Sequence, residues 1–210
     1  MNIPKSSKSY KNVSVGKNAT IGEFVIIGVP PRGKSAGELK TVIGDNAVIR
    51  SHSVIYAGNV IGDNFETGNG VNIRENNKIG NNVKIGTHSI MEHDIEIFDN
   101  VNIHSNVFIC EYSKIEDGCF VGPSVCFLNA PHPLGKRIKE YLTGPTLKKK
   151  CKIGANSTLL PGVIIGEMSL VGAGSVVTKN IPAGKVVVGN PAKIKKSIKK
   201  LEGPFGNPYE

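Results

Sequence analysis

Five histidines and one asparagine are the side chains of this sequence best suited to catalysis. The histidines are His52, His88, His93, His104 and His132. An imidazole changes charge near neutral pH and can take a proton from a nucleophile at cellular pH. His132 is the candidate general base, because it lies in a polar, proline-containing segment that reads as a loop, where chemistry is usually placed. Asn106 is the candidate for stabilising an oxyanion.

A sixfold repeat defines the elements that must position these residues. Large apolar residues recur at every sixth position from Ile43 to Phe127, with Thr67 as the exception, and the pattern resumes at Leu147. This period fits neither an amphipathic helix nor a half-buried strand, but it is typical of a parallel β-helix. Two segments, 28–40 and 129–146, break the period and are predicted to be loops extruded from the rod.

The repeat resembles that of the hexapeptide-repeat acyltransferases. The resemblance implies an all-β fold, a left-handed parallel β-helix with an extruded loop and a short C-terminal helix, assembled as a homotrimer. The stretch VGPSVCFLNAPHPLG, residues 121–135, is similar to a segment of the sugar O-acetyltransferases. In that family the matching histidine is the general base, which implies that His132 deprotonates an acceptor hydroxyl for attack on an acetyl thioester.

Residues 151–196 resemble the C-terminal signature of the same enzymes, which implies acetyl-CoA as co-substrate. The signature includes LPGV at 160–163 and GNPAK at 189–193. Ala155 and Ala173 fall where small residues let the pantetheine arm approach the backbone. Thr178, Lys179 and Lys196 fall near the nucleotide end, where cations would meet the 3′-phosphate and the pyrophosphate.

Residues 102–129 resemble a different subfamily, the nucleotide-sugar N-acetyltransferases. There an asparagine at the position of Asn106 lies at the transfer site, and Glu111 belongs to the same stretch. Those enzymes commonly lack the histidine, because an amine acceptor can already be neutral and nucleophilic. The chain therefore combines features of O- and N-acetyltransferases, and it leaves the choice open. The alternative is that Asn106 has only a structural role, as one of the many asparagines at the corners of the rod.

The histidine spacing supports a rival hypothesis, a zinc enzyme. His52, His88 and His93 are spaced 36 and 5 residues apart, as are the zinc ligands of γ-class carbonic anhydrases, which are also trimeric β-helices. Two coils separate His52 from His88 by about 10 Å, whereas zinc–nitrogen bonds are about 2.1 Å, so a neighbouring subunit would have to complete the site. The phase is also wrong, because His88 follows the inward Ile85 by three residues rather than two. We therefore predict no metal.

Composition argues against two classes of binding partner, nucleic acids and membranes. The net charge is +9, concentrated in lysines near 148–152 and 193–200, and no aromatic residues are interleaved with them, which argues against nucleic acid. No stretch is long and apolar enough for a membrane span. The four cysteines lack a C-x-x-C spacing, so reduced thiols in a cytoplasmic protein are expected.

These observations predict one β-helix domain over 1–190, followed by a C-terminal helix and tail over 191–210. The helix is expected from Ile194, Ile198 and Leu201, which recur at helical spacing. The predicted function is acetyl transfer to a sugar, foremost to the amino group of a nucleotide-linked amino sugar. A sugar O-acetyltransferase and an anhydrase-like zinc enzyme are the alternatives. Four cations toward the N-terminus are candidates for an acceptor phosphate: Arg32, Lys34, Arg50 and Arg74.

Overall fold

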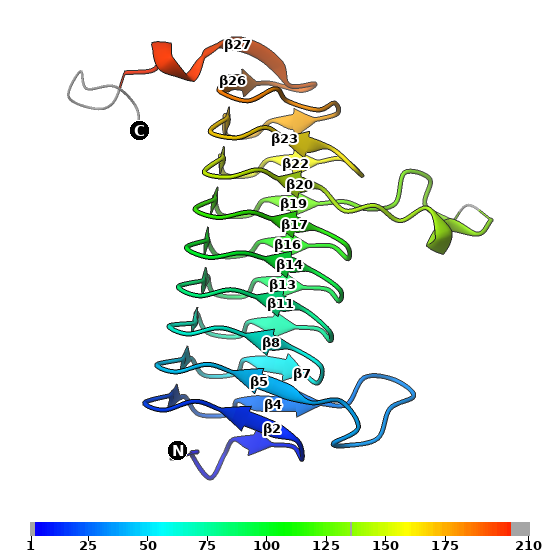
Figure 1. The fold of residues 1–210 in the computed structure, drawn as a ribbon. Helices are drawn as coiled ribbons and strands as arrows, with labels where there is room; N and C mark the ends of the chain where they lie inside the picture. Colours follow the sequence, from blue (N-terminus) through cyan, green and yellow to red (C-terminus); the bar gives the residue numbers. More distant parts are fainter. Residues whose placement is uncertain (1–2, 135, 203–210) are drawn as a thin grey trace.

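The chain forms a left-handed parallel β-helix, shown in Figure 1. The computed structural model describes residues 3–134 and 136–202, and within them the strands form three sheets of nine, eight and ten strands. Residues 18 positions apart pair side by side, as Asn72 pairs with Ile90. One coil therefore consumes three hexapeptides, and the rod rises about 4.8 Å per coil.

Each sheet stacks one strand from every coil. Sheet A contains β1 (Lys8–Ser9), β4 (Ile26–Val29), β7 (Val54–Tyr56), β10 (Asn72–Ile73), β13 (Ile90–Met91), β16 (Phe108–Ile109), β19 (Cys126–Phe127), β22 (Thr158–Leu159) and β25 (Val176–Val177). Sheet B contains β2 (Val13–Val15), β5 (Thr41–Ile43), β8 (Val60–Ile61), β11 (Lys78–Ile79), β14 (Glu96–Ile97), β17 (Lys114–Ile115), β20 (Thr146–Leu147) and β23 (Ile164–Ile165).

Sheet C completes the prism. It contains β3 (Thr20–Ile21), β6 (Val48–Ile49), β9 (Glu66–Thr67), β12 (Lys84–Ile85), β15 (Asn102–Ile103), β18 (Phe120–Val121), β21 (Lys152–Ile153), β24 (Leu170–Val171), β26 (Lys185–Val188) and β27 (Lys193–Ser197). The chain passes from sheet A to B to C and back to A in every coil. We call the three rows of corners the A–B edge, the B–C edge and the C–A edge.

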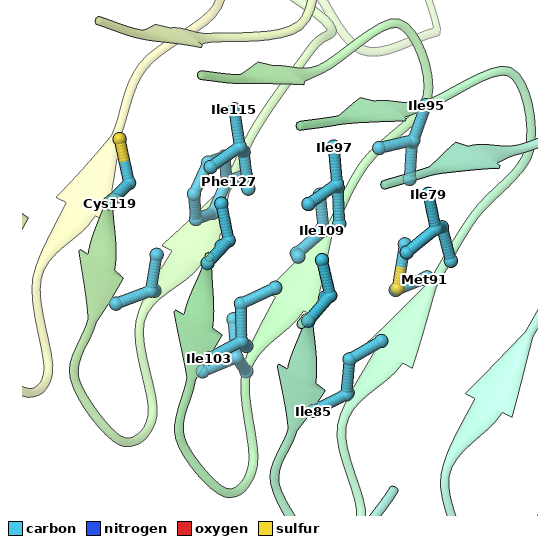
Figure 2. Packing of buried hydrophobic residues seen from close by; sticks show 14 of the residues in the cluster. Ile79, Ile85, Met91, Ile95, Ile97, Ile103, Ile109, Ile115, Cys119 and Phe127 are labelled. Atoms are coloured by element: carbon cyan, nitrogen blue, oxygen red, sulfur yellow. The ribbon is translucent and has the colours of Figure 1, made fainter. Parts of the chain in front are cut away.

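The sixfold apolar residues fill the interior of the rod. In Figure 2 the side chains of Ile79, Ile85 and Met91 point into the same narrow core. Thr67, the exception to the repeat, is also buried. Its hydroxyl oxygen accepts a hydrogen bond from the backbone N–H of Arg50 at 3.0 Å, which satisfies a polar group that would otherwise be costly to bury.

Asparagines at the B–C edge turn the chain and also bond the coils to one another. Asn46, Asn64, Asn82 and Asn100 all have φ between 55° and 59°, a left-handed conformation that asparagine tolerates better than most residues. The side-chain amides of Asn46, Asn64 and Asn82 each donate to the side-chain carbonyl of the asparagine one coil above, at 3.0, 2.9 and 3.0 Å. The abundant corner asparagines thus form a ladder along the rod.

Both predicted loops leave the rod at the A–B edge, one between β4 and β5 and the other between β19 and β20 (Figure 1). The second loop carries a single 3-10 turn, η1 (Ile138–Glu140). Neither η1 nor any other helix among the described residues is long and apolar enough to cross a membrane.

The predicted C-terminal helix is wrong over most of its length. Residues Lys193–Ser197 form β27, which pairs antiparallel with β26, and helical structure is confined to the 3-10 turn η2 (Ile198–Lys200). Ile198 is buried, but Ile194 is exposed. The last coil leaves the end of sheet C open, and a returning strand satisfies its backbone groups. The rest of the predicted tail, 203–210, lies outside the described residues.

Candidate active site

Three of the predicted site residues lie on the C–A edge. Asn106 is a corner residue with φ 59°, and its exposed side chain lies just beyond β15. Ala155 and Ala173 occupy the adjacent corner position two and three coils farther along the rod. A Cβ added to Gly174, the residue after Ala173, would meet no atom within 4 Å, so the space beside this corner is open.

The other predicted residues lie elsewhere. His132 is exposed in the loop that leaves the A–B edge, and among the described residues its imidazole makes no hydrogen bond or ion pair. Thr178 and Lys179 are exposed where the A–B edge ends, after β25. Lys196 lies on β27, opposite Val186 of sheet C. No single surface of one chain brings all seven predicted residues together.

A second histidine on the A–B edge has the geometry that His132 lacks. His93 Nδ1 lies 2.8 Å from Asp94 Oδ2, and its Nε2 lies 3.7 Å from Glu111 Oε1 in the next coil. Tyr112 meets the imidazole edge-on, with ring centroids 6.1 Å apart. The imidazole therefore lies between two carboxylates, an arrangement that orients the ring.

Glu111 links this histidine to the extruded loop. Its Oε2 accepts a hydrogen bond of 2.6 Å from Asn129 Nδ2, and Asn129 is where the loop leaves the rod. Sequence reasoning considered His93 only as a zinc ligand and missed this group. The available signal was that residues 93, 111 and 129 are each 18 apart, which places them in one column of the A–B edge.

Other ionisable groups near this column are already paired with one another. Arg74 donates two hydrogen bonds to Glu75, at 2.8 and 2.9 Å, and one to Glu92 at 3.3 Å. Burial favours a raised pKa for Glu75, but the hydrogen bonds from Arg74 outweigh it and the pKa is lowered. Arg74 thus already pairs with two carboxylates, which makes it a poor ligand for an acceptor phosphate.

Two more of the candidate phosphate ligands lie in the loop between β4 and β5. Lys34 pairs with Glu38 at 2.6 Å, and Arg32 is exposed there. Neither lies near Asn106 or His93 within one chain.

The neighbouring thiol is not a nucleophile. Cys110 precedes Glu111 and is buried, and burial raises the pKa of its thiol to about 12. A protonated thiol attacks a thioester slowly. An acyl-enzyme at this cysteine is therefore disfavoured, and direct transfer between two bound substrates is the simpler chemistry.

The three histidines with zinc-like spacing are not gathered by one chain. His52 and His88 are corner residues of the C–A edge, with φ 64° and 57°, whereas His93 lies on the A–B edge. His52 stacks on Phe24 with ring centroids 5.0 Å apart. Within 3–134 and 136–202, no three histidine, cysteine or carboxylate side chains are grouped as metal ligands would be.

The two halves of the candidate site flank sheet A and lie within one coil of each other along the rod. His93 and Asn106 are 13 residues apart, which corresponds to about 3.5 Å of rise in an 18-residue coil. In a ring of parallel rods related by a threefold axis, equivalent residues lie at equal heights. If sheet A faces that axis, the A–B edge of one chain meets the C–A edge of the next, and His93 faces Asn106 across the boundary.

Comparison with known proteins agrees with the repeat. Residues 144–179 match the family model described as bacterial transferase hexapeptide (six repeats). Galactoside O-acetyltransferase of Lactococcus lactis is 41% identical over 81 residues, which cover 37% of this chain and 39% of that protein. The dTDP-3-amino-3,6-dideoxy-α-D-galactopyranose 3-N-acetyltransferase of Aneurinibacillus thermoaerophilus is 57% identical over 49 residues, or 23% of this chain and 26% of that protein.

The matched stretches thus span less than half of the length of either relative. Among solved structures, a UDP-N-acetylglucosamine acyltransferase from Bacteroides fragilis aligns with a TM-score of 0.60, at 18% identity, over 92% of this chain and 74% of that chain. At this identity the likeness concerns the fold, which agrees with a rod of stacked hexapeptides along most of the chain.

Proposed function

Because this chain belongs to the hexapeptide-repeat acyltransferase superfamily, we propose that it transfers an acetyl group from acetyl-CoA to the amino group of a nucleotide-linked amino sugar. The observation that carries this proposal is the imidazole of His93, which lies between Asp94 and Glu111 and within one coil of Asn106 along the rod. The similarity to both an O- and an N-acetyltransferase of sugars supports a sugar acceptor.

The site is assembled between subunits of a homotrimer. From β4 to β25 the residues that point outward from sheet A carry no charge: Ile26, Val54, Asn72, Ile90, Phe108, Cys126, Thr158 and Val176. Sheets B and C present lysines and glutamates outward at β11 and β14, and at β9 and β12. A stable interface core is depleted of charged residues, so sheet A is the face that lies nearest the threefold axis.

Acetyl-CoA would lie along the C–A edge. The thioester meets Asn106, the pantetheine arm passes over Ala155 and Ala173, and the phosphates reach the lysine-rich end of the rod. Lys196 is exposed there on β27, and Lys179 follows β25. This order gives the extended molecule small residues where it is narrow and cations where it is charged.

The proposed chemistry is direct transfer. The acceptor nitrogen attacks the thioester carbonyl, and His93 of one subunit, oriented by Asp94, accepts the proton that the nitrogen loses. The side chain of Asn106 from the neighbouring subunit donates a hydrogen bond to the developing oxyanion. The carbon–sulfur bond then breaks, and the coenzyme A thiolate takes a proton. His132, on the loop tied to Glu111 through Asn129, is the second candidate base.

The test is a thiol-release assay with acetyl-CoA and a panel of acceptors. We expect release of the coenzyme A thiol with nucleotide-linked amino sugars. Release should be much slower with neutral galactosides, and also with nucleotide-linked sugars whose amino group is already acetylated. Mass spectrometry of the product then distinguishes an amide from an ester. Saturable acetyl-CoA binding without transfer to any member of the panel would overturn the proposed acceptor class, and the lack of acetyl-CoA binding would overturn the function.

A further inference from the structure

A polar hollow lies on the outer side of sheet C, beside the C–A edge. Its volume is about 310 Å³, and its lining includes Arg50, Glu66, Lys84, Thr87, Asn102 and His104. It arises from a break in the glycine pattern of this edge. The residue that follows each sheet C strand from β3 to β24 is glycine at 22, 68, 86, 122, 154 and 172, but arginine at 50 and histidine at 104. Arg50 and His104 therefore form the two ends of a hollow whose floor is glycine backbone.

The hollow carries more positive than negative charge. Glu66 is shared by two cations, with Arg50 Nη2 at 3.3 Å and Lys84 Nζ at 3.5 Å from its carboxylate oxygens. Both cations are more than half exposed, so each keeps donors free for a further oxygen ligand. Thr87 and Asn102 add neutral hydrogen-bond donors to the lining. Such a set suits an anion that also bears hydroxyl groups.

The position of the hollow relates it to the candidate active site. His104 is two residues before Asn106, and its ring is fixed against Phe120, with centroids 4.9 Å apart. Arg50 lies three coils below His104, a separation of about 14 Å along the rod. Ala155 and Ala173 lie on the other side of Asn106. A ligand in the hollow would therefore approach the transfer position from the end opposite to acetyl-CoA.

We propose that this hollow binds the phosphate end of the acceptor, a glycosyl phosphate or diphosphate. Arg50 and Lys84 bind the phosphate oxygens, and Glu66 lowers the affinity because its carboxylate competes for the same two cations. The inference rests on the proposed function, because it assigns the sugar end of the same molecule to Asn106. The Glu66 carboxylate bridges the two cations, and the oxygens of a phosphate would bridge them in the same way.

The test uses inorganic pyrophosphate as the probe, measured by calorimetric titration of the full chain at low ionic strength. Saturating coenzyme A is present throughout, so that the sites for its own phosphates are filled. We expect Arg50→Gln and Lys84→Gln each to weaken pyrophosphate binding about tenfold, which is what the loss of one charge-assisted hydrogen bond produces. Glu66→Gln should tighten binding severalfold, a gain that loss of a merely structural ion pair would not give.

Lys78→Gln is the matched control. Lys78 is the first residue of a two-residue strand, like Lys84, and pairs with Glu96 at the same 3.5 Å, but it lies on sheet B. Its removal should leave pyrophosphate binding unchanged. Undetectable binding, or equal binding by the Lys78 and Lys84 variants, would overturn the inference. The proposed function is judged separately, by thiol release from acetyl-CoA, which these titrations do not measure.

Discussion

At the scale of single residues, the contrast between His93 and His132 makes a direct prediction. We expect His93→Gln to lower kcat about 100-fold, since general base catalysis contributes at least that much in many enzymes, with little change in acetyl-CoA affinity. Asp94→Asn should also lower kcat, because the ring loses the carboxylate that orients it. Steady-state rates measured over a range of acetyl-CoA concentrations would separate this loss in kcat from any change in the KM for acetyl-CoA.

The control for this prediction is His52→Gln. His52 stacks on Phe24 and lies more than two coils below His93, so its loss should leave kcat unchanged. A His132→Gln variant with the greater loss would assign the base to the loop and leave His93 a structural role. Either result identifies one imidazole, because only one of the two can accept the acceptor proton in a single step.

At the scale of elements, the sixfold period was sufficient to predict the strands and both extruded loops. It could not predict the end of the rod, because 193–197 pairs with β26 only where no further coil covers sheet C, and that is a tertiary condition rather than a local preference. The 18-residue coil could have placed His93, Glu111 and Asn129 in one column. The contact of His93 with Asp94 depends on side-chain rotamers, which the period does not specify.

The asparagine ladder of the B–C edge gives a prediction for stability. Asn82 has φ 56° and bonds to Asn64 and Asn100. Asn82→Ala removes both contacts and leaves a Cβ residue in the left-handed region, which costs roughly 1–2 kcal/mol for the conformation alone. Asn82→Gly removes the same contacts without that strain. We expect the alanine variant to unfold at a lower urea concentration than the glycine variant, both measured at one protein concentration.

Equal urea midpoints for the two variants would mean that the ladder, rather than the backbone conformation, accounts for the asparagines of this edge. A midpoint for Asn82→Gly that matches the wild type would mean the reverse. The two variants therefore separate the contribution of the side-chain hydrogen bonds to stability from that of the left-handed backbone conformation, which occur together at every corner asparagine of this edge.

At the scale of the whole molecule, the function depends on which face of the rod meets another copy. Ile90 on sheet A and Val60 on sheet B are both exposed aliphatic residues at the start of two-residue strands, 42% and 52% exposed respectively. A charge placed at an interface core must be desolvated without a partner, whereas a charge on a free face stays hydrated. Ile90→Lys should therefore dissociate the trimer, while Val60→Lys should leave it intact.

Sedimentation velocity measures the assembly, and circular dichroism checks that both variants keep their strands. We expect Ile90→Lys to sediment as a smaller species and to lose transferase activity, because His93 and Asn106 would no longer face each other across a boundary. Mixing Ile90→Lys with wild-type chains should restore no more activity than the wild type supplies. A trimeric and active Ile90→Lys protein, beside a dissociated Val60→Lys protein, would transfer the interface to sheet B and separate the two halves of the site proposed here.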